Sequence, residues 1–337
     1  MSYRIFITGS GIVEEAQQLL KKEKCIFEIG DPKDCPKDIA RKLRIFNPDG
    51  IIVRQGDINS EVQDAAKNLK VICKHGVGTD NIDIEAATKR GIPVMYTPLA
   101  NYESTAEHTL ALILSLVRRI PFEDKRIRSG VFDKKQYDGI ELQGKTLGLI
   151  GFGRIGRRLA ELVAPFKMNV VVYHPSCKVE NLPQYISKVE RVESLFTQAD
   201  IISIHCQLTP ETGKLINKHT IAQMKGGAYL INTARGGIVN EYDLLQALKE
   251  KRISGAALDV FEIEPPAVDN PLFKLDNVIL TPHIGGASDN SLKNMGIEAI
   301  KNVLAVLKGA SFDIESLVNK EIVEIVPANH HINPVCD

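Results

Sequence analysis

The feature that most constrains this chain is a glycine-rich turn between two apolar strand patterns. An apolar run at 147–150 is followed by Gly151, Gly153 and Gly156, which have the spacing G-x-G-x-x-G. An amphipathic helical pattern comes next, and 169–173 has the pattern of a second buried strand. In such a β-α-β unit the three glycines permit a sharp turn, close approach of a pyrophosphate, and tight packing of helix on strand. The stretch therefore predicts a dinucleotide site with its phosphates at the helix N-terminus.

The residue after the second strand bears on the choice of dinucleotide. A site of this kind usually carries an acidic residue there, which binds the ribose 2′-hydroxyl and would repel the 2′-phosphate of NADP. This chain has His174 at that place, followed by Lys178 four residues on. A protonated His174 or Lys178 can attract a phosphate. We therefore expect NAD or NADP as cofactor, and the replacement of the acid by His174 makes NADP plausible.

Length and charge exclude several classes of protein. A chain of 337 residues exceeds what one core usually holds, so two domains are expected. Basic and acidic residues number 42 each, which leaves no basic field for nucleic acid or for a membrane surface. No apolar run approaches the length of about 20 residues that a membrane helix needs. The six cysteines are scattered, which predicts thiols in a reducing, cytoplasmic setting and no metal site.

Alternating patterns divide the chain into two α/β regions. Residues 1–99 alternate apolar strand patterns with amphipathic helical ones, and a second alternation begins at 144 with the glycine-rich turn. Such alternation predicts parallel sheets covered by helices on both faces. A final helical pattern at 288–308, which Ser288 or Asp289 can cap, could carry the chain back to the first region.

The segment between the two regions suggests an assembly. Residues 101–119 predict a helix that is apolar around most of its surface, which suits either a domain spine or a subunit contact. Residues 120–143 are polar and lack periodicity, as expected of an arm that reaches another subunit. Together they suggest a homodimer.

Three polar stretches follow predicted strands of the second region. Arg235 comes directly after the strand pattern 228–232, and its planar fork suits a carboxylate held by two bonds. Asp259, which ends another strand, could contact the nicotinamide or order the loop, and Glu264 follows it. His283 follows a further strand and precedes two glycines. Because parallel strands end at one edge of their sheet, these residues are expected beside the dinucleotide turn.

Reduction of a 2-keto acid by hydride requires this combination of groups. Arginine binds the carboxylate and polarises the carbonyl, while a histidinium donates the proton. A carboxylate beside the histidine orients the ring and favours its cationic form. Each residue alone has a plainer interpretation, because arginines and glutamates are common surface charges and a lone histidine is more often structural. Their shared position past strand ends favours the catalytic interpretation.

Several motifs in one order resemble the D-isomer-specific 2-hydroxyacid dehydrogenase family, particularly its short-form D-3-phosphoglycerate dehydrogenases. The resemblance spans about residues 50–309. The motifs lie at 75–83 (HGVGTDNID), 106–109 (AEHT), 151–156 (GFGRIG), 232–237 (NTARGG), 259–265 (DVFEIEP) and 282–286 (PHIGG). The family usually has an acid where this chain has His174.

The resemblance implies specific roles. Arg235, Glu264 and His283 would be the catalytic set. The backbone N–H groups of Val77 and Gly78 would bind the substrate carboxylate, and Arg54 and Lys74 would face its far end. The cofactor-binding set would comprise Thr105, Gly151, Gly153, Arg154, Ile155, Gly156, His174, Cys206, Thr233, Ala234, Arg235, Asp259, His283, Gly285 and Gly286.

The expected fold is α/β, with two doubly wound parallel-sheet domains. The family implies a flavodoxin-like substrate-binding domain made of residues 1–99 and 289–337. A Rossmann-type dinucleotide-binding domain, residues 100–288, would be inserted into it.

The expected activity is hydride transfer between NAD(P)H and a small 2-keto acid or D-2-hydroxy acid. Arg54 and Lys74 favour a substrate with a second anionic group, such as 3-phosphoglycerate, and the alternative is a hydroxypyruvate or glyoxylate reductase. A different hypothesis is an NAD(H)-sensing binding protein similar to the C-terminal-binding corepressors, which resemble the same family. Such a protein would need an extended disordered tail and a peptide groove, and turnover of a keto acid distinguishes the two.

Overall fold

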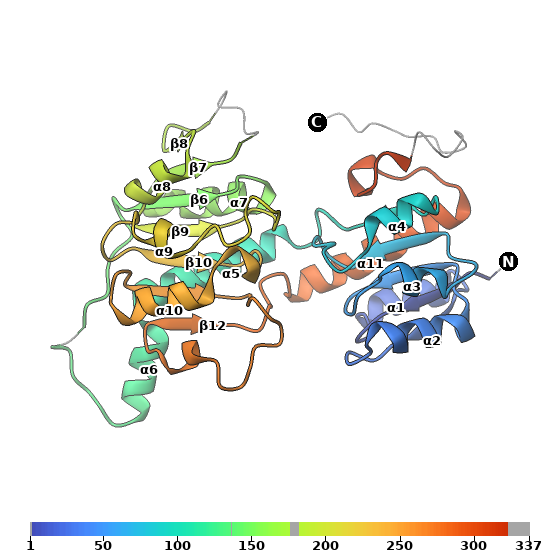
Figure 1. The fold of residues 1–337 in the computed structure, drawn as a ribbon, viewed down its shortest axis with the longest axis horizontal. Coiled ribbons are helices and arrows are strands. Elements are labelled where there is room, and N and C mark those ends of the chain that lie inside the picture. The colour runs from blue at the N-terminus through green and yellow to red at the C-terminus, as the bar shows by residue number, and fades with distance from the viewer. Residues whose placement is uncertain (1, 136, 176–181, 323–337) are drawn as a thin grey trace. The chain divides into compact units, whose positions relative to one another are not determined.

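The computed structural model describes residues 2–135, 137–175 and 182–322, and Figure 1 shows its fold. The chain forms two compact units, Met1–Asn101 with Ala287–Asp337 and Tyr102–Gly286. Within the described residues, no helix combines the length and the apolar character needed to cross a membrane.

The first unit contains a five-stranded sheet in which every pair of strands is parallel. Its strands are β1 (Arg4–Ile7), β2 (Ile26–Ile29), β3 (Gly50–Val53), β4 (Val71–Lys74) and β5 (Val94–Met95), in the spatial order β2-β1-β3-β4-β5. This is the flavodoxin-like order, with its switch point between β1 and β3. All four residues of β3 are buried, as expected of a central parallel strand that is covered on both faces.

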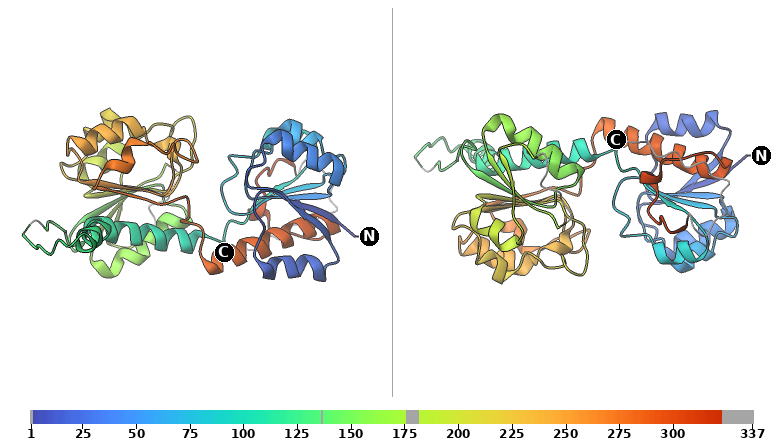
Figure 2. Two further views of the ribbon diagram at one scale, coloured as in Figure 1. Left: turned by 90° about the horizontal axis from the view of Figure 1, so that it is seen from below. Right: turned by 90° about the horizontal axis from the view of Figure 1, so that it is seen from above.

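Helices cover both faces of this sheet, as Figure 2 shows. One face carries α1 (Glu14–Lys22) and α11 (Asp289–Lys308), and the other carries α2 (Pro36–Phe46), α3 (Ser60–Asp64) and α4 (Ile84–Lys89). The side chain of Ser288 caps α11 by accepting the N–H of Ser291, and Gly309 ends the helix in a left-handed conformation. The expectation that a helix at 288–308 returns to the first region is confirmed.

The strand at one edge of the first sheet is short. Within the stretch 92–96, only Val94–Met95 forms the strand β5. Next to it, the Asn319 side chain accepts the N–H of Val94 at 2.8 Å, and the Val318 N–H bonds to the Val94 carbonyl at 2.8 Å. The segment around Asn319 therefore satisfies the outer edge of β5 in place of another strand.

The second unit contains seven parallel strands. They are β6 (Thr146–Ile150), β7 (Asn169–Tyr173), β8 (Ile186–Lys188), β9 (Ile201–Ile204), β10 (Tyr229–Asn232), β11 (Gly255–Leu258) and β12 (Val278–Leu280), in the order β12-β11-β10-β9-β6-β7-β8. This is the Rossmann arrangement with one further strand, and its switch point lies between β6 and β9. The predicted fold class is confirmed.

Two layers of helices enclose the second sheet (Figure 2). One face carries α5 (Tyr102–Val117) and α7 (Arg154–Val163), and the other carries α8 (Val192–Gln198), α9 (Lys218–Ile221) and α10 (Glu241–Lys249). Short single-turn helices occur at Ala164–Phe166, Gly236–Ile238, Pro271–Lys274 and Ile314–Ser316. Seven residues of α5 are buried, and the helix packs on α7 and the sheet, so α5 is a spine of its own domain.

The segment after α5 is more regular than its sequence pattern predicts. The first part of the expected polar arm forms the helix α6 (Ile120–Arg128), which the lack of periodicity did not indicate. Salt bridges within the helix, such as Arg128 to Asp124 at 2.8 Å, support it, although none of its residues is buried. A helix held by polar pairs lacks the apolar stripe on which periodicity analysis depends.

The turn from β6 into α7 shows why glycines occupy two of its positions. Gly151 has φ +99°, and a Cβ placed there would lie 2.6 Å from the carbonyl carbon of His205. A Cβ at Gly156 would lie 2.6 Å from the Gly151 carbonyl oxygen. A Cβ at Gly153 would meet no atom within 4 Å. Glycine is therefore required by the packing of the fold at 151 and 156. At 153 the protein itself leaves the space open, so a bound molecule can approach the backbone.

This difference leads to a prediction for two alanine variants. Gly151→Ala should lower the free energy of unfolding by about 1–3 kcal/mol, because it adds a clash at a left-handed position. Gly153→Ala, the matched control, should stay within about 0.5 kcal/mol of the parent. Urea denaturation followed by circular dichroism measures both. Equal stabilities of the two variants would contradict the assignment.

Candidate active site

His283 and Glu264 form a direct pair at the carboxyl edge of the second sheet. His283 lies just after β12 and Glu264 lies in the loop after β11, with Nδ1 and Oε2 separated by 2.7 Å. Both side chains remain partly exposed. An ionised carboxylate only accepts hydrogen bonds, so Nδ1 carries the proton in this contact. Nε2 is then the ring nitrogen through which His283 can exchange a proton with a bound molecule.

Several groups keep Glu264 ionised. Burial alone would raise the pKa of Glu264, but hydrogen bonds from His283 and from the Phe261 N–H, together with the positive charges of His283 and Arg235, lower that pKa overall. The Phe261 N–H donates to Oε1 at 3.0 Å, while Oε2 bonds to His283. Both oxygens of the carboxylate are thus held, which orients the histidine ring.

The buried carboxylate of Asp259 organises the loop that carries His283. Its Oδ1 accepts the Thr281 hydroxyl at 2.6 Å and the Ile284 N–H at 2.9 Å, and its Oδ2 accepts the Gly285 N–H at 2.7 Å. Its backbone carbonyl accepts the His283 N–H at 2.8 Å. Burial tends to raise the pKa of Asp259, but the hydrogen bonds outweigh burial and lower that pKa. Of the two roles expected for Asp259, the structure shows the ordering of the loop.

His283 itself adopts an unusual backbone conformation. Its φ is +54°, in the left-handed region that costs a residue with a side chain about 1–3 kcal/mol. The bonds to Asp259 hold the loop in this conformation. The side chain of His283 is therefore directed to Glu264 by the fold of the loop.

The turn that carries Arg235 is built from Asn232 at the end of β10. The buried amide of Asn232 donates to the Arg235 carbonyl at 2.9 Å and accepts the Ala234 N–H at 3.0 Å. A Cβ at Gly236 would lie 1.9 Å from the carbonyl carbon of Phe261, so only glycine permits this approach. The Arg235 turn therefore lies against the loop that leads to Glu264.

Helix α5 contacts both of these loops. The Thr109 hydroxyl lies 2.9 Å from that of Thr233, and the Ser104 hydroxyl donates to the Gly285 carbonyl at 2.9 Å. His108 Nε2 lies 3.2 Å from the hydroxyl of Thr281. Sequence reasoning assigned no role to Ser104, His108 or Thr109. The available signal was the motif at 106–109, which the family resemblance includes.

The predicted dinucleotide residues gather at the same edge of the second sheet. Gly153 and Arg154 are exposed at the N-terminus of α7, and Ile155 is half-buried beside them. Cys206 follows β9, where its N–H lies 2.7 Å from the position of a Cβ on Gly151. His174 follows β7 and is half-buried, whereas Lys178 lies outside the described residues. The remaining predicted contacts, Thr105, Thr233, Ala234 and Gly286, also belong to this domain.

The predicted substrate residues lie in the first unit, apart in the chain from the catalytic set. Arg54 follows β3, and its Nη1 donates to the Ser10 carbonyl at 2.9 Å and hydroxyl at 2.7 Å. Lys74 ends β4, with its Nζ 2.8 Å from Asn81 Oδ1. Arg54 thus sits at the switch point of the first sheet.

A glycine-rich loop follows Lys74. The loop contains Val77 and Gly78, and Val77 is exposed. The N–H of Gly76 donates to the Thr97 hydroxyl at 3.0 Å. This bond anchors the start of the loop that holds the predicted backbone donors.

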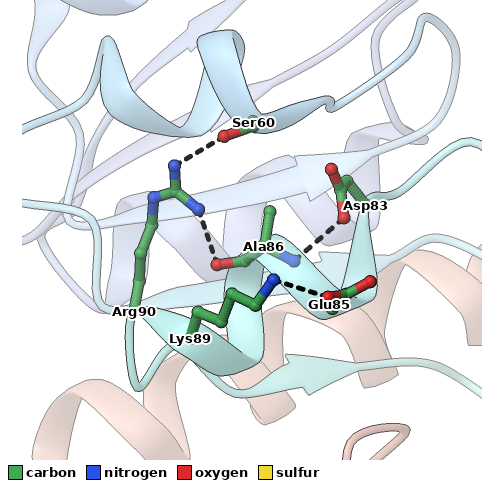
Figure 3. A pocket seen from close by; sticks show the side chains of 6 residues that line it. All are labelled: Ser60, Asp83, Glu85, Ala86, Lys89 and Arg90. Atoms are coloured by element: carbon green, nitrogen blue, oxygen red, sulfur yellow. Dashed lines mark hydrogen bonds and ion pairs between the residues drawn. The ribbon is translucent and has the colours of Figure 1, made fainter.

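An open pocket beside α4 holds none of the predicted site residues. Figure 3 shows that its charged side chains bond to one another and to nearby backbone. Arg90 donates to the Ser60 hydroxyl at 2.7 Å and to the Ala86 carbonyl at 2.6 Å, and Lys89 pairs with Glu85 at 2.5 Å. Because these side chains are bonded to other protein groups, the pocket gives no indication of a ligand site. Within the described part of the chain, no three His, Cys, Asp or Glu side chains are grouped to hold a metal ion.

The chain is similar to several known dehydrogenases and reductases. Residues 110–285 match the family model of the D-isomer specific 2-hydroxyacid dehydrogenase NAD-binding domain. The chain is 43% identical over 319 residues to a D-3-phosphoglycerate dehydrogenase of Archaeoglobus fulgidus, covering 94% of this chain but only 60% of that protein. It is 42% identical over 332 residues to a glyoxylate reductase of Thermofilum pendens, covering 96% of each.

A solved structure shares the fold over most of its length. The D-lactate dehydrogenase of Aquifex aeolicus, determined with NAD and lactic acid, has a TM-score of 0.80 and 32% sequence identity, covering 90% of this chain and 96% of that one. Together with the match to the family model, these similarities show that the chain belongs to the D-isomer-specific 2-hydroxyacid dehydrogenase family.

Proposed function

We propose that the protein transfers a hydride between a nicotinamide dinucleotide and a small 2-keto acid or D-2-hydroxy acid. The observation that carries this proposal is the His283–Glu264 pair at 2.7 Å beside the Arg235 turn. The pair and the Arg235 turn lie past the carboxyl ends of strands, in the same sheet that carries the glycine-rich turn. This edge is where open parallel sheets bind their ligands.

The residues of the turn fit a dinucleotide. Gly153 leaves its surroundings open, and the N-terminus of α7 presents backbone N–H groups and a positive dipole end. Arg154 adds an exposed positive charge at that end. A nicotinamide dinucleotide bound there would supply the hydride for reduction or accept it in the reverse direction. The open space at Gly153 is the reason that its alanine variant, although folded, should bind the dinucleotide weakly.

The protein groups divide the remaining work. Arg235 binds the substrate carboxylate with its fork and polarises the adjacent carbonyl. As hydride reaches the carbonyl carbon, His283 donates a proton from Nε2 to the carbonyl oxygen. Glu264 stabilises the cationic ring before this transfer and orients it during the transfer. In the oxidation direction, the neutral His283 accepts the hydroxyl proton.

Arg54 supports a substrate with a second anionic group. Its guanidinium is half-buried, and its hydrogen bonds go to the uncharged oxygens of Ser10 and Gly11. Burial lowers the pKa of Arg54, although an arginine remains charged. Among the described residues, these hydrogen bonds of Arg54 include no carboxylate, and a positive charge of this kind suits a phosphate. The keto form of 3-phosphoglycerate therefore fits better than glyoxylate or hydroxypyruvate, which are the alternatives.

The experiment that tests the activity is one panel of 2-keto acids with NADH and NADPH in parallel. Loss of nicotinamide absorbance reports reduction. Turnover of a keto acid supports the enzyme, and its preferred member identifies the substrate. Nicotinamide binding without turnover of any member would favour the binding-protein hypothesis.

The first variants separate the proton donor from its partner. His283→Ala should lower kcat by about 10²–10⁴-fold, the usual contribution of general acid catalysis. Glu264→Gln should lower kcat less than His283→Ala, because the amide can still orient the ring but carries no negative charge beside it. Measurements of kcat for both variants test this.

Two further variants complete this comparison. Arg235→Ala should damage both KM for the keto acid and kcat, because one side chain serves binding and polarisation. His219→Ala, at an exposed position of helix α9, should leave both constants unchanged. A near-parent kcat in His283→Ala would show that the histidine is structural.

The residue after β7 should influence cofactor choice. His174→Asp should move the ratio of kcat/KM values towards NADH, because the acid can bind the ribose 2′-hydroxyl and repels a 2′-phosphate. The parent should use NADPH at a measurable rate. Steady-state kinetics with both cofactors test this, and an unchanged ratio would show that position 174 does not decide.

We also propose a homodimer formed through the cofactor domain. The segment after α5 exposes apolar side chains at Ile120, Ile127, Val131 and Phe132, the last of them 82% exposed. Sedimentation at micromolar concentration should give a dimer, and Phe132→Ser should weaken it. Ile45→Ser, which alters an equally exposed residue of the first unit, should not. A monomeric parent protein would rule the proposal out.

A further inference from the structure

His108 stands at the point where α5 meets the loop of the proposed proton donor. Its Nε2 lies 3.2 Å from the Thr281 hydroxyl and 3.5 Å from Asp259 Oδ1, and its side chain is 19% exposed. Thr281 and Asp259 link the His108 ring by hydrogen bonds to the backbone of the His283 loop. The ring also lies beside that loop, since a Cβ at Gly285 would be 3.4 Å from His108 Cδ2. Among the described residues, His108 makes no hydrogen bond to His283 or Glu264, so its hydrogen bond acts on them through Thr281 and Asp259.

The hydrogen bonds in this cluster determine where the protons lie. Asp259 is ionised, since its hydrogen bonds outweigh burial and lower its pKa, so its oxygens only accept. The Thr281 hydroxyl has one proton and donates it to Asp259 at 2.6 Å. Its oxygen can therefore only accept from His108, which requires a proton on His108 Nε2. The geometry thus places a proton on His108 Nε2, which faces the Thr281 hydroxyl at 3.2 Å and Asp259 Oδ1 at 3.5 Å, while Thr281 donates to Asp259.

The bond from His108 orients the Thr281 hydroxyl towards Asp259. The hydroxyl then occupies one lone pair of Asp259 Oδ1. Asp259 also accepts the Ile284 N–H on Oδ1 at 2.9 Å and the Gly285 N–H on Oδ2 at 2.7 Å. Those bonds maintain the left-handed φ of +54° at His283. These bonds connect the His108 side chain on α5 with the loop that carries His283.

We propose that His108 is a positioning residue for the reaction, which acts through Thr281 and Asp259 to hold His283 against Glu264. The inference rests on the proposed function for its kinetic consequence, whereas the protonation of His108 Nε2 is a property of the folded protein. The Arg235 turn is held separately, by Thr109 and Thr233. Loss of His108 should therefore affect proton transfer much more than binding of the keto acid.

Two substitutions at this position distinguish positioning from space filling. His108→Leu fills a similar volume without a donor, whereas His108→Gln keeps an N–H at about the same reach. His108→Leu should lower kcat by about 10- to 100-fold, the scale expected for a small misplacement of a catalytic group, with KM for the keto acid within about threefold of the parent. His108→Gln should recover most of kcat, and His219→Leu, at an exposed position of α9, should match the parent.

The opposite results would overturn the proposal. If His108→Leu retained the parent kcat, the cluster would not position the donor. If His108→Gln had parent-like thermal stability but a kcat as low as that of His108→Leu, the donor would not be what matters. Should His108→Leu fail to fold, the glutamine variant and the ring spectrum described next decide the question.

A spectroscopic measurement tests the donor without any turnover. Long-range ¹H–¹⁵N correlation of the histidine rings in the parent should show a protonated Nε2 for His108. Thr281→Val should shift that ring signal and leave the ring of His219 unchanged. A neutral His108 ring protonated on Nδ1 alone would overturn the inference, even in an active enzyme. A parent that reduces no keto acid would instead count against the proposed function, with the ring spectrum still judging the cluster.

Discussion

The buried carboxylate of Asp259 is the interaction on which the arrangement of the candidate site depends. The residue is 1% exposed, and its side chain accepts one hydroxyl and two backbone N–H groups. Leaving a buried polar group unpaired costs about 1–3 kcal/mol, and more for a charge. The loop from Thr281 to Gly285 is therefore constrained to bring its donors to Asp259. The left-handed conformation of His283 is one consequence of that constraint.

The candidate site residues of both units lie where the same topological rule places them. Parallel strands end at one edge of a sheet, and the connections diverge where the strand order reverses. In the second sheet this point lies between β6 and β9, where Gly151 packs against the backbone of His205. In the first sheet it lies between β1 and β3, where Arg54 bonds to Ser10. Residues distant in the chain become neighbours at each point.

Helix α5 connects the parts of the second domain that must act together. Thr109 forms a hydrogen bond to Thr233 in the Arg235 turn, and Ser104 and His108 contact the His283 loop. Glu103 forms a salt bridge with Arg158 of α7 at 2.7 Å. One helix thus contacts the two loops of the candidate site and the helix of the dinucleotide turn. Groups held on a rigid element keep their mutual geometry, and hydride and proton transfer are sensitive to small displacements.

The sequence by itself determined the class of fold, the dinucleotide turn and the positions of Arg235, Glu264 and His283 past strand ends. Local sequence signals suffice for these features, because each strand or helix pattern and the G-x-G-x-x-G spacing lie within a short stretch of the chain. Only the tertiary structure decided that Asp259 orders the loop, that Ile186–Lys188 forms the edge strand β8, and that His108 meets Thr281. Strand β8 has a single buried apolar residue, too few for a pattern. His108 and Thr281 are 173 residues apart, and their contact exists only after the helix packs on the sheet.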